Sequence, residues 1–477
     1  MVRFNNHKKS IERSALMDII QTITEIITTG FKNNLTKLVE DRQDISQFIL
    51  STQKDLNEAG RCLVAEALEI LDEAVKGSEG RSRKWYVQEK DKPNSIATVF
   101  GEVHYTSTYY RSKEDGSYAR LSDELVGIEA HDKMDLSLKA KCVELAEKTP
   151  YRRSGKMVSE ALELSGQTVM NAIRWLGPVA PYKGPENAEK RKVEYLFIEA
   201  DEDHVTMRDH RCGEPKLVYV HEGIRQVSEK RWELKNPIYF SGMYRESEEL
   251  WEIVEEYIEN AYDREQIKTI YLSGDRGGWI RTGARWIRDA VYVVDKYHLL
   301  KYVRQAGGHI ENGCDAIWEA INKQDREYLE VVFETIRDHP DSNGKGKTLA
   351  EAFRYIRESY DTTKHYLDEA YRGCSAEGHV SHILSDRLSS RPRVWCERGI
   401  DEMARLRVTV KNGGEIYPLM LEKKQERKRK LAWRKVDAEI VHKRKLAAGA
   451  EMQHNIPYIN RGQVCESLRM MKSFRNL

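Results

Sequence analysis

The sequence predicts an α/β protein built on a mixed five-stranded sheet, with a large helical insertion and a helical N-terminal region. The first observation is the order of elements after Glu194, where three strand-like apolar segments precede helix, strand, short helix and strand. The second is that three of these strands end at an aspartate. The third is a wholly helical stretch over residues 299–372. This order is that of a ribonuclease-H-like fold in which the helical stretch is an insertion before the last core helix.

Length and composition exclude several classes of protein. A chain of 477 residues is too long for one ordinary core, so two or three domains are expected. No segment approaches the roughly 20 apolar residues of a membrane span, and the N-terminus lacks a secretory signal, so the cytoplasm is the expected compartment. The 7 cysteines include no C-x-x-C pair, which argues against a disulfide framework or a zinc ribbon.

The region before the sheet is predicted to contain helices and a small β-meander. Residues 1–84 have apolar residues at three- and four-residue steps, which is typical of amphipathic helices. Residues 85–137 alternate between apolar and polar, with a turn at Asp115-Gly116, which predicts the meander. Its tyrosines can pack in the sheet or stack on bases, and we expect packing for Tyr105, Tyr109 and Tyr110.

Residues 138–178 have the pattern of a helix-turn-helix unit. One helix is predicted over 156–162 and a second over 167–176, with Leu164-Ser165-Gly166 as the turn. Any two short helices joined through Ser-Gly give the same pattern, so DNA contact and a purely structural role both remain open. The residues that the second helix would offer to base edges or phosphates are Gln167, Thr168, Asn171 and Arg174. A linker rich in Pro and Gly follows over 179–189, and the catalytic domain is expected over 190–412.

Acids at strand ends carry the predicted chemistry. Asp201 and Asp275 end the first and fourth strands, which are neighbours in a ribonuclease-H-like sheet. An α/β sheet opens its crevice beyond the carboxyl ends of its strands, so the two carboxylates should lie side by side. They repel one another unless a cation lies between them, and Mg²⁺ prefers such oxygen ligands. A third acid from a later helix would complete a site for two metal ions about 4 Å apart.

Each acid also has a simpler interpretation. An aspartate at a strand end is commonly a turn or cap residue. Asp203 competes with Asp201 for the first position, because both follow the same apolar run. Glu377 lies where a helix can begin, so its charge would also stabilise the helix dipole.

Further polar residues surround this last predicted helix. Cys374, His379 and His382 might indicate zinc, but no second cluster completes a tetrahedral set. After the helix, side chains that fit either phosphate contact or capping are Ser389, Ser390, Arg391 and Arg393. The tail, 413–477, is helical and basic, and residues 422–445 hold 11 Lys/Arg against 4 Asp/Glu. That run is either a solvated helix face or an arm that contacts phosphates.

Several long segments resemble a known bacterial family. They are IEADEDHV, KLVYVHEG, YFSGMYRESEELWEIVEEYI, IYLSGDRGGWI, VYVVDKYHLLKYV and GCSAEGHVSHILSDRLSSRPRVWCERGIDEMARLR. Over nearly the whole chain the sequence resembles the ISLre-type insertion-sequence transposases, a family of uncharacterised UPF type. The motif from Asp201 to Val205 is also distantly similar to the first-acid motif of Mutator-type transposases, and Asp295-Lys-Tyr-His298 resembles their D/C-x-x-H motif.

The resemblance implies a DDE-type transposase, which cleaves the ends of an insertion sequence and joins the 3′-hydroxyl to target DNA. It implies Asp201, Asp275 and Glu377 as catalytic acids holding two Mg²⁺ ions, for which Mn²⁺ would substitute, with Asp295 and His298 as accessory residues. Double-stranded DNA and further copies of the chain are the implied partners.

One residue departs from the family pattern. Arg276 stands where a small residue is expected after the second acid, and it can contact a phosphate or weaken the site. Arg276 thus leaves an inactive, transposase-derived DNA-binding protein as an alternative. The same metal site would also serve a metal-dependent nuclease without strand transfer, which is the other alternative.

Overall fold

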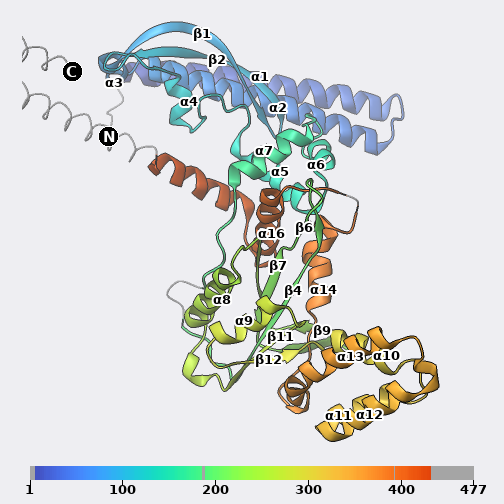
Figure 1. Ribbon diagram of the computed structural model, residues 1–477. Coiled ribbons are helices and arrows are strands. Elements are labelled where there is room, and N and C mark those ends of the chain that lie inside the picture. The colour runs from blue at the N-terminus through green and yellow to red at the C-terminus, as the bar shows by residue number, and fades with distance from the viewer. Residues whose placement is uncertain (1–5, 185–188, 392, 431–477) are drawn as a thin grey trace, which may run out of the picture. The chain divides into compact units, whose positions relative to one another are not determined.

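The computed structural model describes residues 6–184, 189–391 and 393–430, with the side chains of residues 6–19 left aside (Figure 1). The chain forms two compact units, Met1–Tyr417 and Pro418–Leu477. Of the second unit, residues 418–430 are described and are helical. The rest of the predicted basic tail lies outside the described residues.

Two long helices run side by side at the start of the first unit, α1 (Asn6–Val39) and α2 (Ile45–Lys76) (Figure 1). Asp44 begins α2 because its carboxylate accepts a hydrogen bond from the Ser46 backbone N–H at 2.8 Å. A short helix, α3 (Glu79–Lys84), then leads into the meander. The helical periodicity of residues 1–84 is thereby confirmed over the described residues.

The meander has the strand order β1-β2-β3, from β1 (Trp85–Thr98), β2 (Gly101–Ser112) and β3 (Tyr118–Ala119). Gly101 makes the turn between β1 and β2 at φ +118°, a conformation that favours glycine. Tyr105 and Tyr110 are buried, which confirms that they pack rather than stack on bases. Tyr109 is half-buried and stacks on Tyr118, with 5.5 Å between ring centroids.

Four helices follow, namely α4 (Leu121–Leu125), α5 (Leu136–Lys148), α6 (Tyr151–Met157) and α7 (Gly166–Leu176). The helix predicted over 156–162 is wrong, because α6 starts directly after Pro150 and ends at Met157. The chain then turns back, and the Leu164 N–H bonds the Gly155 carbonyl at 2.9 Å. A side chain at Gly155 would collide with the Leu164 carbonyl, so glycine permits this return. The second predicted helix is confirmed as α7, which Ser165 caps.

The central sheet has five strands in the order β10-β7-β4-β11-β12. They are β4 (Tyr195–Glu202), β7 (Lys216–His221), β10 (Ile238–Gly242), β11 (Thr269–Gly274) and β12 (Ala290–Val294). Strands β4, β7 and β10 are antiparallel neighbours, whereas β4, β11 and β12 run parallel. The sheet is therefore mixed, and the adjacency predicted for its first and fourth long strands is present.

The two faces of this sheet are covered by different elements. On one face, Leu196 and Ile198 pack with Trp251 of α8 (Ser247–Ala261) and Ile280 of α9 (Gly278–Trp286). On the other, Phe197, Tyr271 and Val293 pack against Tyr366 and Tyr371. Successive residues of β4 thus face opposite layers, as the pleat requires. The short 3₁₀ helix η1 (Arg264–Gln266) precedes β11.

Two hairpins were not predicted: β5 (Val205–Thr206) with β6 (Cys212–Gly213), and β8 (Ile224–Ser228) with β9 (Arg231–Leu234). Their strands are short and largely exposed, so they lack the apolar runs that mark buried strands.

A helical segment separates β12 from the last part of the sheet domain. It contains α10 (Lys296–Gly307), α11 (Gly313–Asn322), α12 (Arg326–Asp338), η2 (Pro340–Ser342), α13 (Gly346–Ser359) and η3 (Tyr360–Leu367). Its core contains both predicted apolar stripes, one from Leu329 to Ile336 and the other from Leu349 to Tyr360.

The chain then returns to the sheet through α14 (Ala376–Val380), the π-helical turn η4 (Ser381–Ser385), α15 (Asp386–Leu388) and α16 (Glu397–Lys411). Helix α14 contacts β4, and α16 contacts β10. Among the described residues, no helix combines the length and apolar character needed to cross a membrane.

Candidate functional site

Two aspartates face each other across the parallel pair β4 and β11. Gly274 pairs with Ala200, so the next residues in register are Asp275 and Asp201. Asp201 is 8% exposed, whereas Asp275 is half-buried and accepts a hydrogen bond from the Gly277 backbone N–H at 2.7 Å. Strand pairing alone therefore places these two carboxylates together at the carboxyl edge of the sheet.

Glu377 reaches the same edge from α14. Its position depends on Glu199, which lies two residues before Asp201 and therefore on the same face of β4. One Glu199 carboxylate oxygen accepts hydrogen bonds from both the backbone N–H and the hydroxyl of Ser375, the residue that precedes α14. The strand that carries the first acid thus also holds the start of the helix that carries the third.

Glu199 is itself held by a buried polar network. Its other oxygen lies 3.0 Å from His221 Nε2, and the Tyr219 hydroxyl donates to the oxygen that Ser375 also bonds. Burial would raise the pKa of Glu199, but the hydrogen bonds from His221 and Tyr219 outweigh it and lower that pKa. Glu199 is therefore an ionised acceptor at neutral pH.

The pKa of Asp201 shows that the acids interact. Burial is the largest cause that raises it, the negative charges of Glu377 and Asp275 add to the rise, and the pKa reaches about 7. Asp201 accepts a hydrogen bond from the Glu202 backbone N–H at 2.9 Å, and this bond opposes the rise. The charge of His298 also opposes it. Within the described chain, the oxygens of the three acids do not all come within 4.8 Å of one another.

Asp295 and His298 border this cluster. Asp295 caps α10 by accepting from the Tyr297 backbone N–H at 3.0 Å, and its other oxygen lies 3.0 Å from His298 Nδ1. That hydrogen bond is the main reason why the pKa of His298 is raised; burial opposes it, and the charges of Asp201 and Asp275 add to the rise. His298 thus brings positive charge to the carboxylates.

Asp203, the rival of Asp201, has a different environment. It is buried, and its Oδ1 accepts from the Ser389 hydroxyl at 2.8 Å and from the His204 backbone N–H at 2.9 Å. Ser389, for which phosphate contact and capping were both open, therefore has its hydroxyl directed to this carboxylate. Asp203 joins the end of β4 to the segment after α15.

Arg276 is directed toward the helical segment. Its guanidinium forms an ion pair with Glu358 and lies over the Tyr355 ring, 5.1 Å from the centroid. Both partners belong to α13. Arg276, the residue that departs from the family pattern, thus connects the end of β11 to the helical segment.

Cys374, His379 and His382 do not form a group of metal ligands within the described ranges. His379 instead packs on the Tyr219 ring, with 4.5 Å between centroids, and its Nδ1 lies 3.3 Å from the Tyr239 hydroxyl. Burial lowers the pKa of His379 to about 4, so it is neutral at physiological pH.

The predicted DNA-contacting face of α7 is available. Gln167, Asn171 and Arg174 are exposed, and Gln167 donates to the Asn171 side chain at 2.9 Å. Thr168 is half-buried, and its backbone N–H donates a hydrogen bond to the Ser165 hydroxyl oxygen at 3.1 Å.

Arg174 and Arg393, predicted from separate segments, line one pocket of about 390 Å³. Sequence analysis missed two other arginines there, Arg208 and Arg387, because only the tertiary fold brings them together. Arg387 is 2% exposed, and its guanidinium lies 5.1 and 5.0 Å from the ring centroids of Tyr151 and Trp395. Burial lowers its pKa to about 10, which still leaves it charged at neutral pH.

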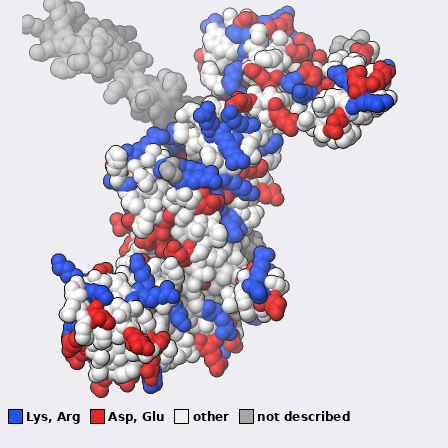
Figure 2. Space-filling model, turned by 90° about the vertical axis from the view of Figure 1, so that its right-hand side faces the viewer, with Lys and Arg blue, Asp and Glu red and all other residues white. Residues whose placement is uncertain are grey.

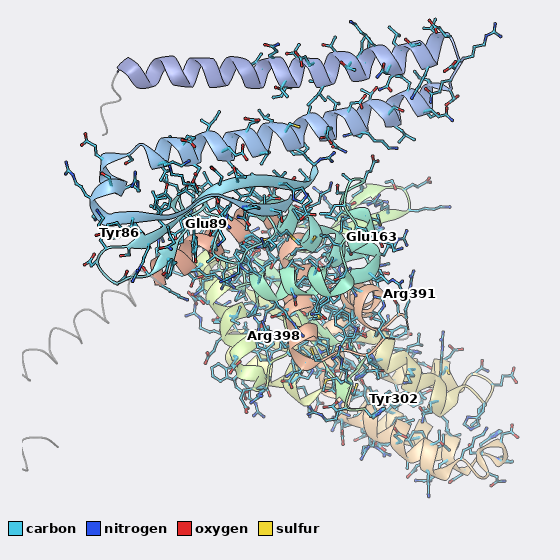
Figure 3. All side chains as sticks on the ribbon, turned by 90° about the horizontal axis from the view of Figure 1, so that it is seen from above. Tyr86, Glu89, Glu163, Tyr302, Arg391 and Arg398 are labelled. Atoms are coloured by element: carbon cyan, nitrogen blue, oxygen red, sulfur yellow. The ribbon has the colours of Figure 1, made fainter. Side chains whose placement is uncertain are left out.

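The surface around these residues carries further basic groups. Arg391 is exposed and lies at the surface of the molecule (Figure 3). Figure 2 shows Lys and Arg side chains gathered on part of one face, beside areas in which acids are frequent.

The fold and the site define an α/β protein with a cluster of acids at the carboxyl ends of two adjacent parallel strands. The chain belongs to the Uncharacterised protein family (UPF0236), whose profile matches residues 39–425. A UPF0236 protein of Caldanaerobacter subterraneus subsp. tengcongensis is 36% identical over 472 residues, which cover 98% of this chain and 99% of the relative. Another from the same organism is 37% identical over 462 residues, covering 96% of each chain. A third is 36% identical over 463 residues, covering 96% of this chain and 97% of the relative, and its name joins 11 gene designations.

Proposed function

We propose that the protein is a DDE-type transposase that cleaves insertion-sequence ends and joins the 3′-hydroxyl to target DNA. The observation that carries the proposal is the meeting of Asp201 and Asp275 in register on adjacent parallel strands. Glu377 adds to it, since its charge helps to raise the pKa of Asp201 to about 7. Perturbed carboxylates at the open edge of an α/β sheet are typical of catalytic sites.

The strand order supports a ribonuclease-H-like core. Three antiparallel strands form a meander, and the two later strands lie parallel to the first, which is the arrangement expected for that fold. The helices α10 to α13 would then be the insertion between the last strand and the helix that carries the third acid.

The acids fit divalent metal ions of the Mg²⁺ class, with Mn²⁺ as a substitute. Their donor atoms are all carboxylate oxygens, and their mutual repulsion would be relieved by a cation. Asp201, Asp275 and Glu377 would hold two ions, which lie about 4 Å apart in sites of this kind. When bound, such ions activate a water or 3′-hydroxyl and stabilise the leaving oxygen.

The chain's own residues prepare this site. Glu199 holds Ser375 and thereby fixes the start of α14, the helix that carries Glu377. The Asp295 carboxylate favours the protonated form of His298, whose charge partly offsets the acids. We assign both Asp295 and His298 as positioning residues.

The repeated gene designations of one relative also support a mobile element. A single name that joins 11 designations in one organism is the pattern that a multiplied element would produce. Element ends and target are double-stranded DNA, and two ends must be paired, so we propose a homo-oligomer in the cytoplasm. Gln167, Asn171, Arg174 and Arg393 are the proposed DNA contacts.

The test uses the full chain, labelled DNA that carries the ends flanking its gene, a plasmid target, and Mg²⁺ or Mn²⁺. Nicks at the ends and joined products are expected. Mobility shifts without nicks would instead identify an inactive DNA-binding descendant, the alternative that Arg276 motivates. Nicks without joined products would identify a nuclease.

Arg174→Ala is expected to weaken binding to all DNA sequences. Loss of one phosphate contact should reduce the slope of log K against log salt by about 1. The measurement is fluorescence anisotropy over a salt series, with Arg337→Ala on α12 as the exposed control. An unchanged slope would remove Arg174 from the interface.

Glu199→Gln is expected to raise the Mg²⁺ concentration needed for half-maximal cleavage by roughly 10–100-fold, as for other residues that orient metal ligands. The amide is neutral and has one acceptor oxygen, so it cannot accept from both Ser375 and His221 as the two carboxylate oxygens of Glu199 do. A Mg²⁺ titration of cleavage measures this effect. Glu222→Gln, which breaks a 2.7 Å ion pair with Arg191, is the control. If the Glu199 variant and the native chain needed the same Mg²⁺ concentration for half-maximal cleavage, a positioning role would be contradicted.

A further inference from the structure

The hairpin β5–β6 gathers three different metal-ligating side chains on one face. Val205 pairs with Gly213 and Thr206 with Cys212, so His204 and Glu214 are opposite each other in the same register. Because side chains alternate along a strand, His204, Cys212 and Glu214 share a face. This shared face is exposed, whereas Val205 and Gly213 are buried on the other face.

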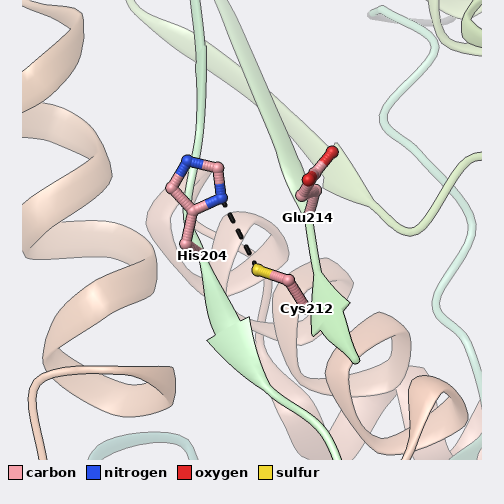
Figure 4. A group of neighbouring side chains, drawn as sticks. All are labelled: His204, Cys212 and Glu214. Atoms are coloured by element: carbon pink, nitrogen blue, oxygen red, sulfur yellow. Dashed lines mark hydrogen bonds between the residues drawn. The ribbon is translucent and has the colours of Figure 1, made fainter. Parts of the chain in front are cut away.

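The ligand atoms of His204, Cys212 and Glu214 all lie within 4.8 Å of one another (Figure 4). Cys212 Sγ is 3.7 Å from His204 Nδ1. In a tetrahedral zinc site, bonds of about 2.3 Å to sulfur and about 2.0–2.1 Å to nitrogen put these two atoms about 3.6 Å apart. The pair is therefore already spaced for a shared ion.

The backbone of this hairpin is firmly held. Gly213 packs so closely on α16 that a Cβ there would lie 2.7 Å from Ile400 Cδ1. On the other strand, the Thr206 carbonyl accepts from the Trp395 N–H at 3.1 Å, and the Arg208 N–H bonds the Trp395 carbonyl at 2.9 Å. Ligands on such a backbone lose little conformational entropy when they bind an ion.

We propose that His204, Cys212 and Glu214 bind one transition-metal ion of the Zn²⁺ class, at a site separate from the three acids. Sulfur and imidazole nitrogen select zinc-like ions, whereas Mg²⁺ prefers oxygen alone. The Cys212 thiol releases its proton to solvent as it binds, and His204 binds in its neutral form. Three protein ligands leave a fourth position for water or another donor.

This site adjoins the acid cluster through Glu202. Burial is the largest cause that raises the pKa of Glu202, and the charges of Asp275 and Glu214 raise it further. The charge of His204 lowers it. A bound ion would therefore act electrostatically on the end of β4. Metal binding at the hairpin does not depend on the proposed transposase activity, so the two proposals can fail separately.

The test is Co²⁺ binding to the reduced full chain in excess Mg²⁺, which occupies oxygen-only sites. The native protein is expected to bind one Co²⁺ with a thiolate-to-metal charge-transfer band. Cys212→Ser should lose this band, whereas Cys62→Ser, on α2, should keep it. His204→Ala and Glu214→Gln should weaken Zn²⁺ competition by at least about tenfold, because removing even an outer partner of a ligand costs that much.

Two results would overturn the proposal. One is the absence of a charge-transfer band in the native chain, and the other is an undiminished band in Cys212→Ser. Circular dichroism of each variant checks folding, and because all three side chains are exposed, their replacement removes no packing from the core.

Discussion

Asp275→Asn is expected to abolish strand cleavage by the full chain while leaving its binding to element ends intact. Asp275 stands in register with Asp201, and the amide that replaces its carboxylate would no longer hold a divalent ion. Metal ions contribute several kcal/mol to such transition states, so cleavage should fall by about a thousandfold or more, which corresponds to about 4 kcal/mol. A gel assay of nicked ends and a mobility-shift assay measure the two properties.

Glu377→Gln should give the same result, and its exposed position on α14 keeps the fold intact. Asp289→Asn is the matched control, since Asp289 is an exposed acid at the turn before β12, with φ +64°. Asparagine tolerates that conformation, so this control should cleave normally. Retained cleavage in Asp275→Asn or Glu377→Gln would remove that residue from the catalytic set.

Asp201→Asn is expected to stabilise the metal-free protein at alkaline pH. The folded state raises the pKa of Asp201 from 3.8 to about 7, so it holds the proton more tightly than the unfolded chain does. This tighter proton binding adds to the free energy of unfolding. The contribution is complete below about pH 4 and is lost as the pH rises through about 7. Three pKa units correspond to about 4 kcal/mol, an upper bound because water reaches the site. Asparagine removes the charge that causes this loss.

The measurement is the thermal unfolding midpoint at pH 5 and pH 8, with and without Mg²⁺. The midpoint of the variant should exceed the native one by much more at pH 8 than at pH 5, and Mg²⁺ should stabilise the native chain more. Asp209→Asn is the control, because Asp209 is exposed and its hydrogen bond with Arg211 lowers its pKa. A variant less stable than the native chain at pH 8 would contradict the buried, repelled carboxylate described for Asp201.

The central strands could be predicted from sequence because burial on both faces requires continuous apolar runs. Strands β4 and β11 are such runs, and the acids follow from where the runs stop. The stripes of the helical segment were equally clear, since a 3.6-residue period places Leu329 and Phe333 on one face.

Other features depend on contacts that are distant in sequence. The hairpin β5–β6 has two residues per strand and needs Ile400 of α16 as its support. The boundary of α6 was missed because the chain after Met157 turns back onto Gly155. Nothing in the sequence indicates that Arg208 and Arg387 lie together, because they come near Arg174 only in the pocket of the folded chain.

Glu199 had a signal that could have been used. An acid inside the apolar run YLFIEAD must be paired when it is buried, and it lies on the same face as Asp201. What sequence could not give is its partner, because Ser375 lies 176 residues away. This contact supplies a physical reason for the position of Glu377, for which the sequence offered mainly a resemblance.

The most direct test of the central claim is anomalous diffraction at the manganese edge, from crystals of the full chain grown with Mn²⁺ and element-end DNA. Two peaks about 4 Å apart, held by Asp201, Asp275 and Glu377, are expected. Crystals that diffract well but show no peak at these acids, or show manganese bound only elsewhere, would contradict the two-metal site and the function proposed from it.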